Sequence, residues 1–199
     1  MRVAVPAVEE MTPRQKEVYE RIAGRRGRFG GPYAVWIQSP DVCERQEALT
    51  AYYRFENDLL PLKLRELVIC LTARFWDAQF SWSSHVQPAI DAGIPQEAME
   101  AIAAKREPVL TDPGEKAFYQ FVMEILRNHY VSDETFKAAE KQFGIKGTVE
   151  IVAAVGAFST VAMVLNTFLV DLKSPPPFAD IGTRPYDEAK THVPKSANK

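Results

Sequence analysis

The sequence predicts an all-α protein, because three observations agree along its whole length. Apolar residues recur at three- and four-residue spacing in one segment after another. Capping residues and prolines stand where these segments begin, and glycines or prolines stand where they end. No stretch shows the alternation of apolar and polar residues that a half-buried strand requires. We expect a helical bundle built on a central helical hairpin within residues 62–94.

The chain of 199 residues, 46% hydrophobic and 25% charged, has the composition of an ordinary globular protein and is long enough to bury a core. We expect a single helical domain over residues 1–173. The polar, proline-punctuated tail over residues 174–199 is expected to be disordered or wrapped on a partner subunit.

In the first third of the chain, Thr12 is a predicted N-cap, Pro13 a first-turn proline and Gln15 the partner of a capping box. They open a helix that runs to the loop over residues 24–31. Residues 39–41, Ser-Pro-Asp, open a second helix. Its apolar face is formed by Ala48, Leu49, Tyr52 and Phe55.

The central hairpin begins after the break at Leu60-Pro61. Apolar residues in its first helix follow the spacing i, i+3, i+4, i+7 and i+11, which is typical of an amphipathic helix. They are Leu64, Leu67, Val68, Leu71 and Phe75. The second helix carries Trp82, Val86, Ala89 and Ile90 and ends at Gly93, whose conformational freedom suits a helix end.

Four further helices are expected in the second half. Their predicted starts lie at Pro95, at Asp112-Pro113 and at Ser132, which is paired with Thr135 as a cap. The helix from Ser132 is expected to end at Gly144. The last helix, residues 148–172, is apolar nearly all round, as a central or interface helix should be.

Charge and hydropathy exclude several partners. The net charge is −2 and cations are mixed with anions, so we expect no nucleic-acid partner. The dense basic run at residues 25–28 is interpreted as a solvated loop. The longest apolar segment, residues 151–170, is interrupted by small and polar residues, so no membrane partner is expected. The N-terminal residues lack the apolar core of a signal peptide, and we expect a cytoplasmic protein.

Glu66 and His85 are the strongest candidates for chemistry. They are 19 residues apart, so they sit on different arms of the predicted hairpin, where packed helices can bring them together. A carboxylate beside an imidazole can fix its tautomer and raise its basicity, which suits proton transfer. A buried hydrogen bond that only stabilises the hairpin is the structural alternative.

The same stretch resembles the carboxymuconolactone decarboxylase family, which includes alkylhydroperoxidase D. The similar segments are 65–69 (RELVI), 73–74 (AR), 80–85 (FSWSSH) and 92–93 (AG). Looser similarity in 31–33, 54–56, 149–152 and 161–166 extends it over roughly residues 12–172. The resemblance implies an alkylhydroperoxidase D-like helical bundle and a closed homo-oligomer (dimer, trimer or hexamer).

In the peroxidase branch of that family, a CxxC motif stands between the glutamate and the histidine. Ala78 and Ser81 occupy those two places here, so CxxC-dependent peroxidase activity is not expected. Cys70 lies in an apolar run and is expected to be buried and inert, whereas partial exposure is expected for Cys43.

The resemblance to the decarboxylase branch therefore implies a cofactor-independent lyase or isomerase acting on a small carboxylated or cyclic organic substrate. His85 would transfer the proton, and Glu66 would orient it. Two alternatives remain open: a peroxidase that uses a cysteine outside the motif, and a non-catalytic binding or assembly protein.

Further residues could complete a substrate pocket. Ser81 precedes His85 by one helical turn, and Arg74 could bind a substrate carboxylate or instead form an ion pair with Asp77. An aromatic set could wall an apolar cavity or belong to an ordinary core. It comprises Tyr33, Trp36, Phe55, Trp76, Phe80 and Trp82. The three widely spaced histidines match no metal motif, so neither a metal nor another cofactor is expected.

Overall fold

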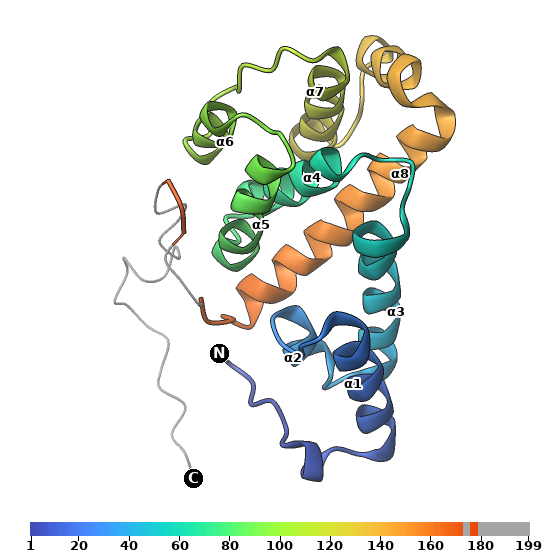
Figure 1. Cartoon of the computed structure of the whole chain (residues 1–199), viewed down its shortest axis with the longest axis vertical. Helices are drawn as coiled ribbons and strands as arrows, with labels where there is room; N and C mark the ends of the chain where they lie inside the picture. The colour runs from blue at the N-terminus through green and yellow to red at the C-terminus, as the bar shows by residue number, and fades with distance from the viewer. Residues whose placement is uncertain (173–175, 179–199) are drawn as a thin grey trace.

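Figure 1 shows the computed structural model, which describes residues 1–172 and 176–178. This part of the chain is helical and contains no strand, which confirms the predicted fold class. Most of the predicted tail, residues 174–199, lies outside the described residues. The elements are η1 (Val8–Glu10), α1 (Pro13–Arg26), α2 (Pro32–Trp36), α3 (Pro40–Ala51), η2 (Tyr52–Glu56), α4 (Leu62–Phe75), α5 (Gln79–Asp91), α6 (Gln96–Ala103), α7 (Pro113–Asn128) and α8 (Asp133–Thr167).

The predicted caps at Thr12, Asp112 and Ser132 are present, whereas the side chain of Ser39 makes no cap hydrogen bond at the start of α3. The Thr12 hydroxyl accepts the Gln15 N–H at 3.3 Å, and the Gln15 side chain accepts the Thr12 N–H at 2.9 Å, which completes the capping box of α1. Asp112 caps α7 through the N–H of Glu115 at 2.9 Å. Each cap satisfies a backbone donor that the first helical turn leaves without a partner, so local sequence fixes these helix starts.

The centre of the fold consists of α4, α5 and α8. The hairpin arms α4 and α5 pack extensively against each other, α8 crosses them, and α7 packs against both α4 and α8 (Figure 1). By length and composition alone α8 could cross a membrane, but 56% of its most apolar window is buried inside this chain. It packs here as the central helix of the bundle.

The break predicted at Gly144 is present within α8. Two helices meet there at a kink, where Gly144 has non-helical angles of φ 65° and ψ 175°. The second helix ends earlier than predicted, at Thr167 rather than residue 172. Leu169 adopts a left-handed φ of 52°, and the N–H of Val170 bonds back to Leu165 at 3.0 Å, which closes the last turn.

Two short elements were not predicted, and both border the site described below. Gly31, with φ 60°, turns the chain into α2. The π-helix η2 follows α3 directly, with the N–H of Asn57 bonded to the carbonyl of Tyr52 at 2.8 Å. The side chain of Asn57 then accepts the N–H of Leu60. Apolar periodicity continues from α3 into η2, so no sequence pattern indicates the wider turn of the π-helix.

Candidate functional site

The hairpin brings Glu66 on α4 to His85 on α5. A three-residue turn, in which Asp77 has a left-handed φ of 51°, reverses the chain between the two helices. Nδ1 of His85 lies 2.6 Å from Oε2 of Glu66, and the two side chains are only 16% and 10% exposed. The predicted meeting of acid and imidazole therefore occurs across the helix corner.

This contact assigns roles to the two ring nitrogens. A carboxylate can only accept, so Nδ1 carries the proton of the shared hydrogen bond. Nε2 has no partner within the described residues. In the neutral ring it holds a lone pair, and this lone pair is not engaged by Glu66.

A cavity of about 250 Å³ borders His85. α4 contributes Glu66 and Arg65, α5 contributes Ser81 and Ser84, and the last turns of α8 close the far side. The remaining lining from these helices is apolar and consists of Leu62, Ile69, Phe80, Phe158, Val161 and Leu165. The acid–histidine pair thus borders a cavity that combines apolar walls with polar side chains, as ligand pockets commonly do.

The predicted aromatic set is divided by the structure. Tyr33, Phe55 and Phe80 line the cavity, together with Ser81. Phe29, Tyr53 and Phe158 also line it and were missed, because they come from a loop, the unpredicted π-helix and the last third of α8.

The other predicted pocket residues lie elsewhere. Trp82 is completely buried, with its indole N–H donated to the carbonyl of Pro177 at 3.1 Å. Trp36 is a core residue packed edge-on against Tyr33. Trp76 stands at the end of α4, where its carbonyl accepts from Asn166. None of the three tryptophans lines the cavity beside His85.

Arg74 is also absent from that cavity and lines a second one between α4, α6 and α7. It forms an ion pair with Asp77, the alternative considered from the sequence, and its Nε donates to the carbonyl of Ala103 at 2.7 Å. Arg74 follows Glu66 by eight residues, and eight residues rotate the side-chain direction about the helix axis by about 80° beyond two full turns. Arg74 and Glu66 therefore do not share a face of α4.

The basic run interpreted as a solvated loop contributes to the site, which corrects that interpretation. Arg25, Arg26 and Arg28 all line the cavity, joined by Arg54 from η2 and Arg65 from α4. The sequence alone did not reveal them because α1, its loop and η2 border the same cavity as α4 only through tertiary packing. No local sequence pattern indicates that these arginines line the same cavity.

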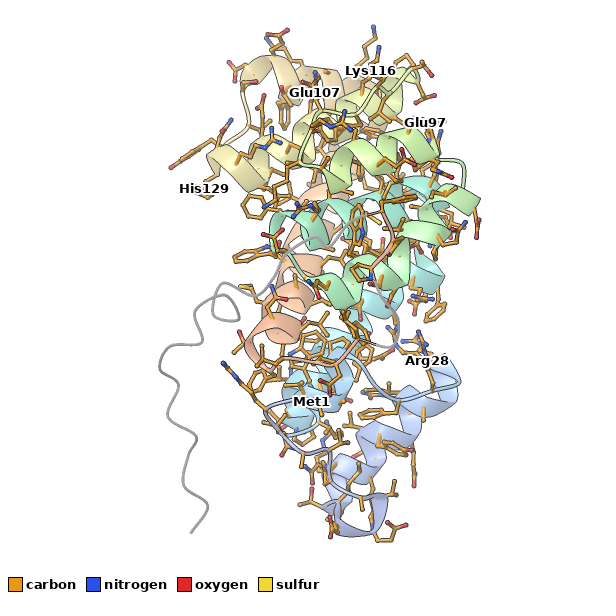
Figure 2. All side chains as sticks on the ribbon, turned by 90° about the vertical axis from the view of Figure 1, so that its left-hand side faces the viewer. Met1, Arg28, Glu97, Glu107, Lys116 and His129 are labelled. Carbon is orange, nitrogen blue, oxygen red and sulfur yellow. The ribbon has the colours of Figure 1, made fainter. Side chains whose placement is uncertain are left out.

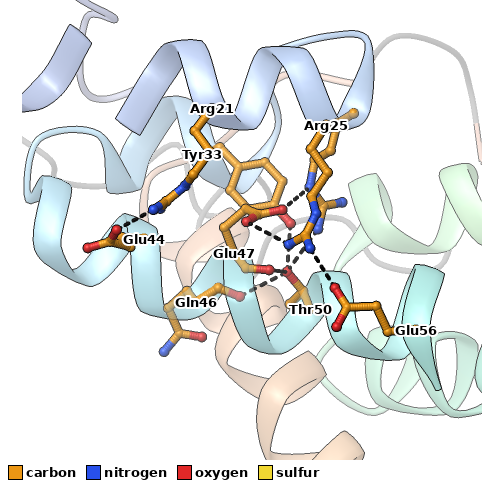
Figure 3. A network of polar contacts seen from close by, with 9 residues as sticks. Arg21, Arg25, Tyr33, Glu44, Gln46, Glu47, Thr50 and Glu56 are labelled. Carbon is orange, nitrogen blue, oxygen red and sulfur yellow. Dashed lines mark hydrogen bonds and ion pairs between the residues drawn. The ribbon is translucent and has the colours of Figure 1, made fainter. Parts of the chain in front are cut away.

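Two of these arginines belong to a polar network between α1 and α3 (Figure 3). Glu47, 2% exposed, accepts Arg26 Nε at 3.1 Å and lies 3.6 Å from Arg25, which also bonds Glu56 at 2.5 Å. Arg26 stacks 4.6 Å from the centre of the Tyr33 ring. Arg25 and Arg26 are therefore neutralised by neighbouring carboxylates and hold one wall of the cavity in place.

The thiols are remote from this chemistry. Cys43 and Cys70 are both completely buried and free, so the partial exposure expected for Cys43 is wrong. Burial raises the pKa of Cys43 to about 12 and raises that of Cys70 well above its usual value. At the two CxxC places, Ala78 is buried at the N-terminus of α5 and Ser81 faces the cavity. Among the described residues, no three His, Cys, Asp or Glu side chains group as metal ligands would.

Fold and site together define an all-α hairpin protein with an acid–histidine pair beside a cavity. The chain has the alkylhydroperoxidase D-like fold, so the resemblance seen in the sequence is confirmed at the level of the fold. No protein-family model matches the sequence. No curated protein matches it either.

Three solved structures carry the comparison. One is a protein of unknown function from Agrobacterium tumefaciens, proposed to be the antioxidant defence protein AhpD. The match has a TM-score of 0.61 and 18% sequence identity, and it covers 70% of this chain and 96% of that chain. The second is the debrominase Bmp8, as a variant in complex with 2,3,4-tribromopyrrole, with a TM-score of 0.67 and 12% identity over 87% of this chain and 93% of that chain. The third is apo Bmp8, with a TM-score of 0.66 and 12% identity over 85% of this chain and 92% of that chain. The TM-scores show a shared fold, and at these low identities they show the fold alone.

Proposed function

We propose that this protein is a cofactor-independent lyase or isomerase in which His85 moves a proton on a small carboxylated or cyclic organic substrate. One observation carries the proposal. The imidazole is held at Nδ1 by Glu66, while Nε2 is left for a ligand at the edge of a cavity. A buried pair with only a packing role does not require an adjacent cavity, so the cavity disfavours a purely structural role.

The chemistry follows from this arrangement. In an isomerase, Nε2 removes a proton from carbon next to a carbonyl, the electron pair moves into an enolate, and the imidazolium returns the proton to a different carbon. In a decarboxylase, the bond to the carboxyl carbon breaks, CO2 leaves, and protonated His85 delivers its proton to the resulting enolate carbon. In both cases the Glu66 carboxylate stabilises the imidazolium, which forms during isomerisation and is the starting state for decarboxylation.

Other cavity residues have supporting roles in this proposal. The hydroxyl of Ser81 lies one turn from His85 and can bond a carbonyl oxygen, while Tyr33, Phe55 and Phe80 enclose the body of the substrate. A cyclic ligand suits these walls. A protein of the same fold, Bmp8, is seen in complex with a small aromatic ring, 2,3,4-tribromopyrrole.

The experiment is a turnover assay with a panel of lactone carboxylic acids, carboxymuconolactone included, following CO2 release and solvent deuterium incorporation by NMR. His85→Ala should abolish turnover and leave the circular dichroism spectrum unchanged. His129→Asn is the matched control, because this exposed histidine has a left-handed φ of 66° that asparagine tolerates. Undiminished turnover in His85→Ala would exclude the mechanism.

The peroxidase alternative is disfavoured by the buried thiols, since a peroxide-reducing cysteine must be an accessible thiolate. A variant with both Cys43→Ser and Cys70→Ser tests it. Thiol-dependent peroxide reduction in the parent protein that disappears in this variant would restore the alternative.

We also propose that the protein works as a closed homo-oligomer. Several large apolar side chains of α8 remain at the surface, with Val149 63%, Val152 50% and Met163 41% exposed. A second subunit would cover them. Light scattering after size exclusion should give a multiple of the 22.4 kDa chain mass, and Val149→Lys with Val152→Lys should reduce it.

A further inference from the structure

We propose that the cavity beside His85 contains a carboxylate subsite formed by Arg28, Arg54 and Arg65. Its ligand is then a small organic anion with a single-ring apolar body. This inference rests on the proposed function only in taking that anion as the substrate; the binding itself requires no catalysis. It is carried by the charges, the hydrogen bonds and the shape of the cavity.

The charges around the cavity are unbalanced. Five arginines line it, and Glu66 is the only carboxylate among the described residues that does, with its Oε2 bonded to His85. Glu47 and Glu56 compensate Arg25 and Arg26 from outside the lining. Three arginines then remain without an ion pair in the described part of the chain: Arg28, Arg54 and Arg65.

This excess of positive charge is local. The whole chain carries a net charge of −2, so the cluster does not arise from a generally basic protein. Cations gathered at a partly enclosed site raise the local concentration of anions and speed their association. A neutral ligand would gain nothing from the arrangement.

Arg65 provides the most specific evidence. One of its terminal nitrogens donates to two backbone carbonyls of η2, that of Tyr53 at 2.8 Å and that of Arg54 at 3.2 Å. Its Nε is buried and has no acceptor among the residues that the structure describes. A buried donor without a partner is costly, and here it belongs to a charged group. A ligand carboxylate is the acceptor that fits a guanidinium best.

The other two arginines are exposed and lie at the mouth of the cavity. Arg28 sits in the loop after α1, on the outer surface of the molecule (Figure 2). Arg54 lies 5.7 Å from the centre of the Phe55 ring, a cavity wall. Long exposed side chains can close over a carboxylate after it enters, so Arg65 anchors the anion and the other two steer and cover it.

The shape of the cavity limits the rest of the ligand. About 250 Å³ is below the usual range of sites for drug-sized molecules, so a single ring with short substituents fits. The walls are aromatic or aliphatic away from the arginines. Arg65 and the acid–histidine pair line the same small space, so one ligand can meet both.

Isothermal titration with benzoate as the probe, and benzamide as its neutral counterpart, tests the subsite. Wild-type protein should bind benzoate at least about tenfold more tightly than benzamide, because only the anion pairs with guanidinium. Arg65→Gln should remove this preference, and Arg65→Lys should keep part of it. The double variant Arg28→Ala with Arg54→Ala should weaken benzoate binding about threefold to tenfold and reduce its salt dependence.

Controls separate the subsite from general charge and from catalysis. Arg45→Ala removes one exposed cation of α3 and should leave benzoate binding unchanged. His85→Ala should still bind benzoate even though it loses turnover. Turnover that depends on His85, combined with equal binding of benzoate and benzamide, would overturn the subsite alone. Retained benzoate preference with undiminished turnover in His85→Ala would instead overturn only the proposed function.

Two further outcomes also count against the subsite. The first is the absence of saturable benzoate binding to the wild type up to about 10 mM. The second is unchanged benzoate affinity in both the Arg65→Gln variant and the double variant. The double variant changes only exposed side chains, so it keeps the test decisive if Arg65→Gln does not fold.

Discussion

Nδ1 of His85 lies 2.6 Å from Oε2 of Glu66, although 19 residues of chain separate them. The contact depends on the turn between α4 and α5, which sets the register of the hairpin. It engages one ring nitrogen and leaves the other without a partner among the described residues, on a ring that lines the cavity. The orientation of the imidazole therefore depends on a single carboxylate, and this dependence can be measured.

Replacing Glu66 should affect both activity and stability. Glu66→Ala leaves the imidazole without its buried acceptor and should lower the free energy of unfolding by about 1–3 kcal/mol. Turnover should fall by about 10²-fold or more, as expected when the orienting group of a histidine is lost. Glu66→Gln keeps an acceptor oxygen and should be less destabilising. Urea titration and turnover measure the two effects, with the exposed Glu20→Ala as control.

Gly31 should be sensitive because of where its side chain would point. A Cβ there would lie 3.1 Å from the Phe80 ring, and φ is 60°. Gly31→Ala should cost about 1 kcal/mol of stability through backbone strain and should also weaken benzoate binding by displacing Phe80. Gly27→Ala is the matched control, since its φ is 68° but nothing lies within 4 Å. Equal benzoate binding in both variants would show that the Phe80 contact does not matter.

The thiols should be unreactive in the folded protein. With a pKa of about 12 and complete burial, Cys43 holds almost no thiolate at pH 8. Reaction of both cysteines with Ellman's reagent should be at least about 100-fold slower than that of a free thiol. Unfolding the protein in guanidinium chloride should expose both cysteines, and both should then react rapidly with the reagent. Rapid native reaction of either cysteine would reopen the peroxidase alternative.

Alkaline pH should destabilise the fold through Tyr53. Burial, followed by the nearby Glu150 carboxylate, raises its pKa well above 10, and its hydroxyl donates to the Glu150 carbonyl at 3.0 Å. Above pH 10 the unfolded chain loses this proton while the folded chain keeps it. The stabilisation is therefore complete below pH 10 and is lost as pH rises through the higher folded value.

Tyr53→Phe tests this dependence. The variant loses one hydrogen bond, so it should be about 1 kcal/mol less stable at pH 7. Between pH 9 and 11 its stability should fall less steeply than that of the wild type. Parallel slopes in urea titrations across that range would show that Tyr53 does not contribute.

Local sequence determined most helix starts and the candidate pair. The caps at Thr12 and Asp112 satisfy backbone donors within one turn, so they work wherever the helix lies. The pairing of Glu66 with His85 followed from apolar periodicity on both arms of a hairpin, because that periodicity leaves few registers for the packed helices.

Tertiary structure alone decided which other residues meet that pair. The arginines of 25–28 and Arg54 come from α1, its loop and η2, and their arrival at the cavity depends on how α1, α3 and α8 pack. Arg74 shows the converse. It is close to Glu66 in sequence, but helical rotation turns it toward a different cavity. The periodicity of apolar residues determines which face of its own helix a residue occupies. The set of residues that line a cavity depends instead on how several helices pack together, and no local sequence pattern encodes that packing.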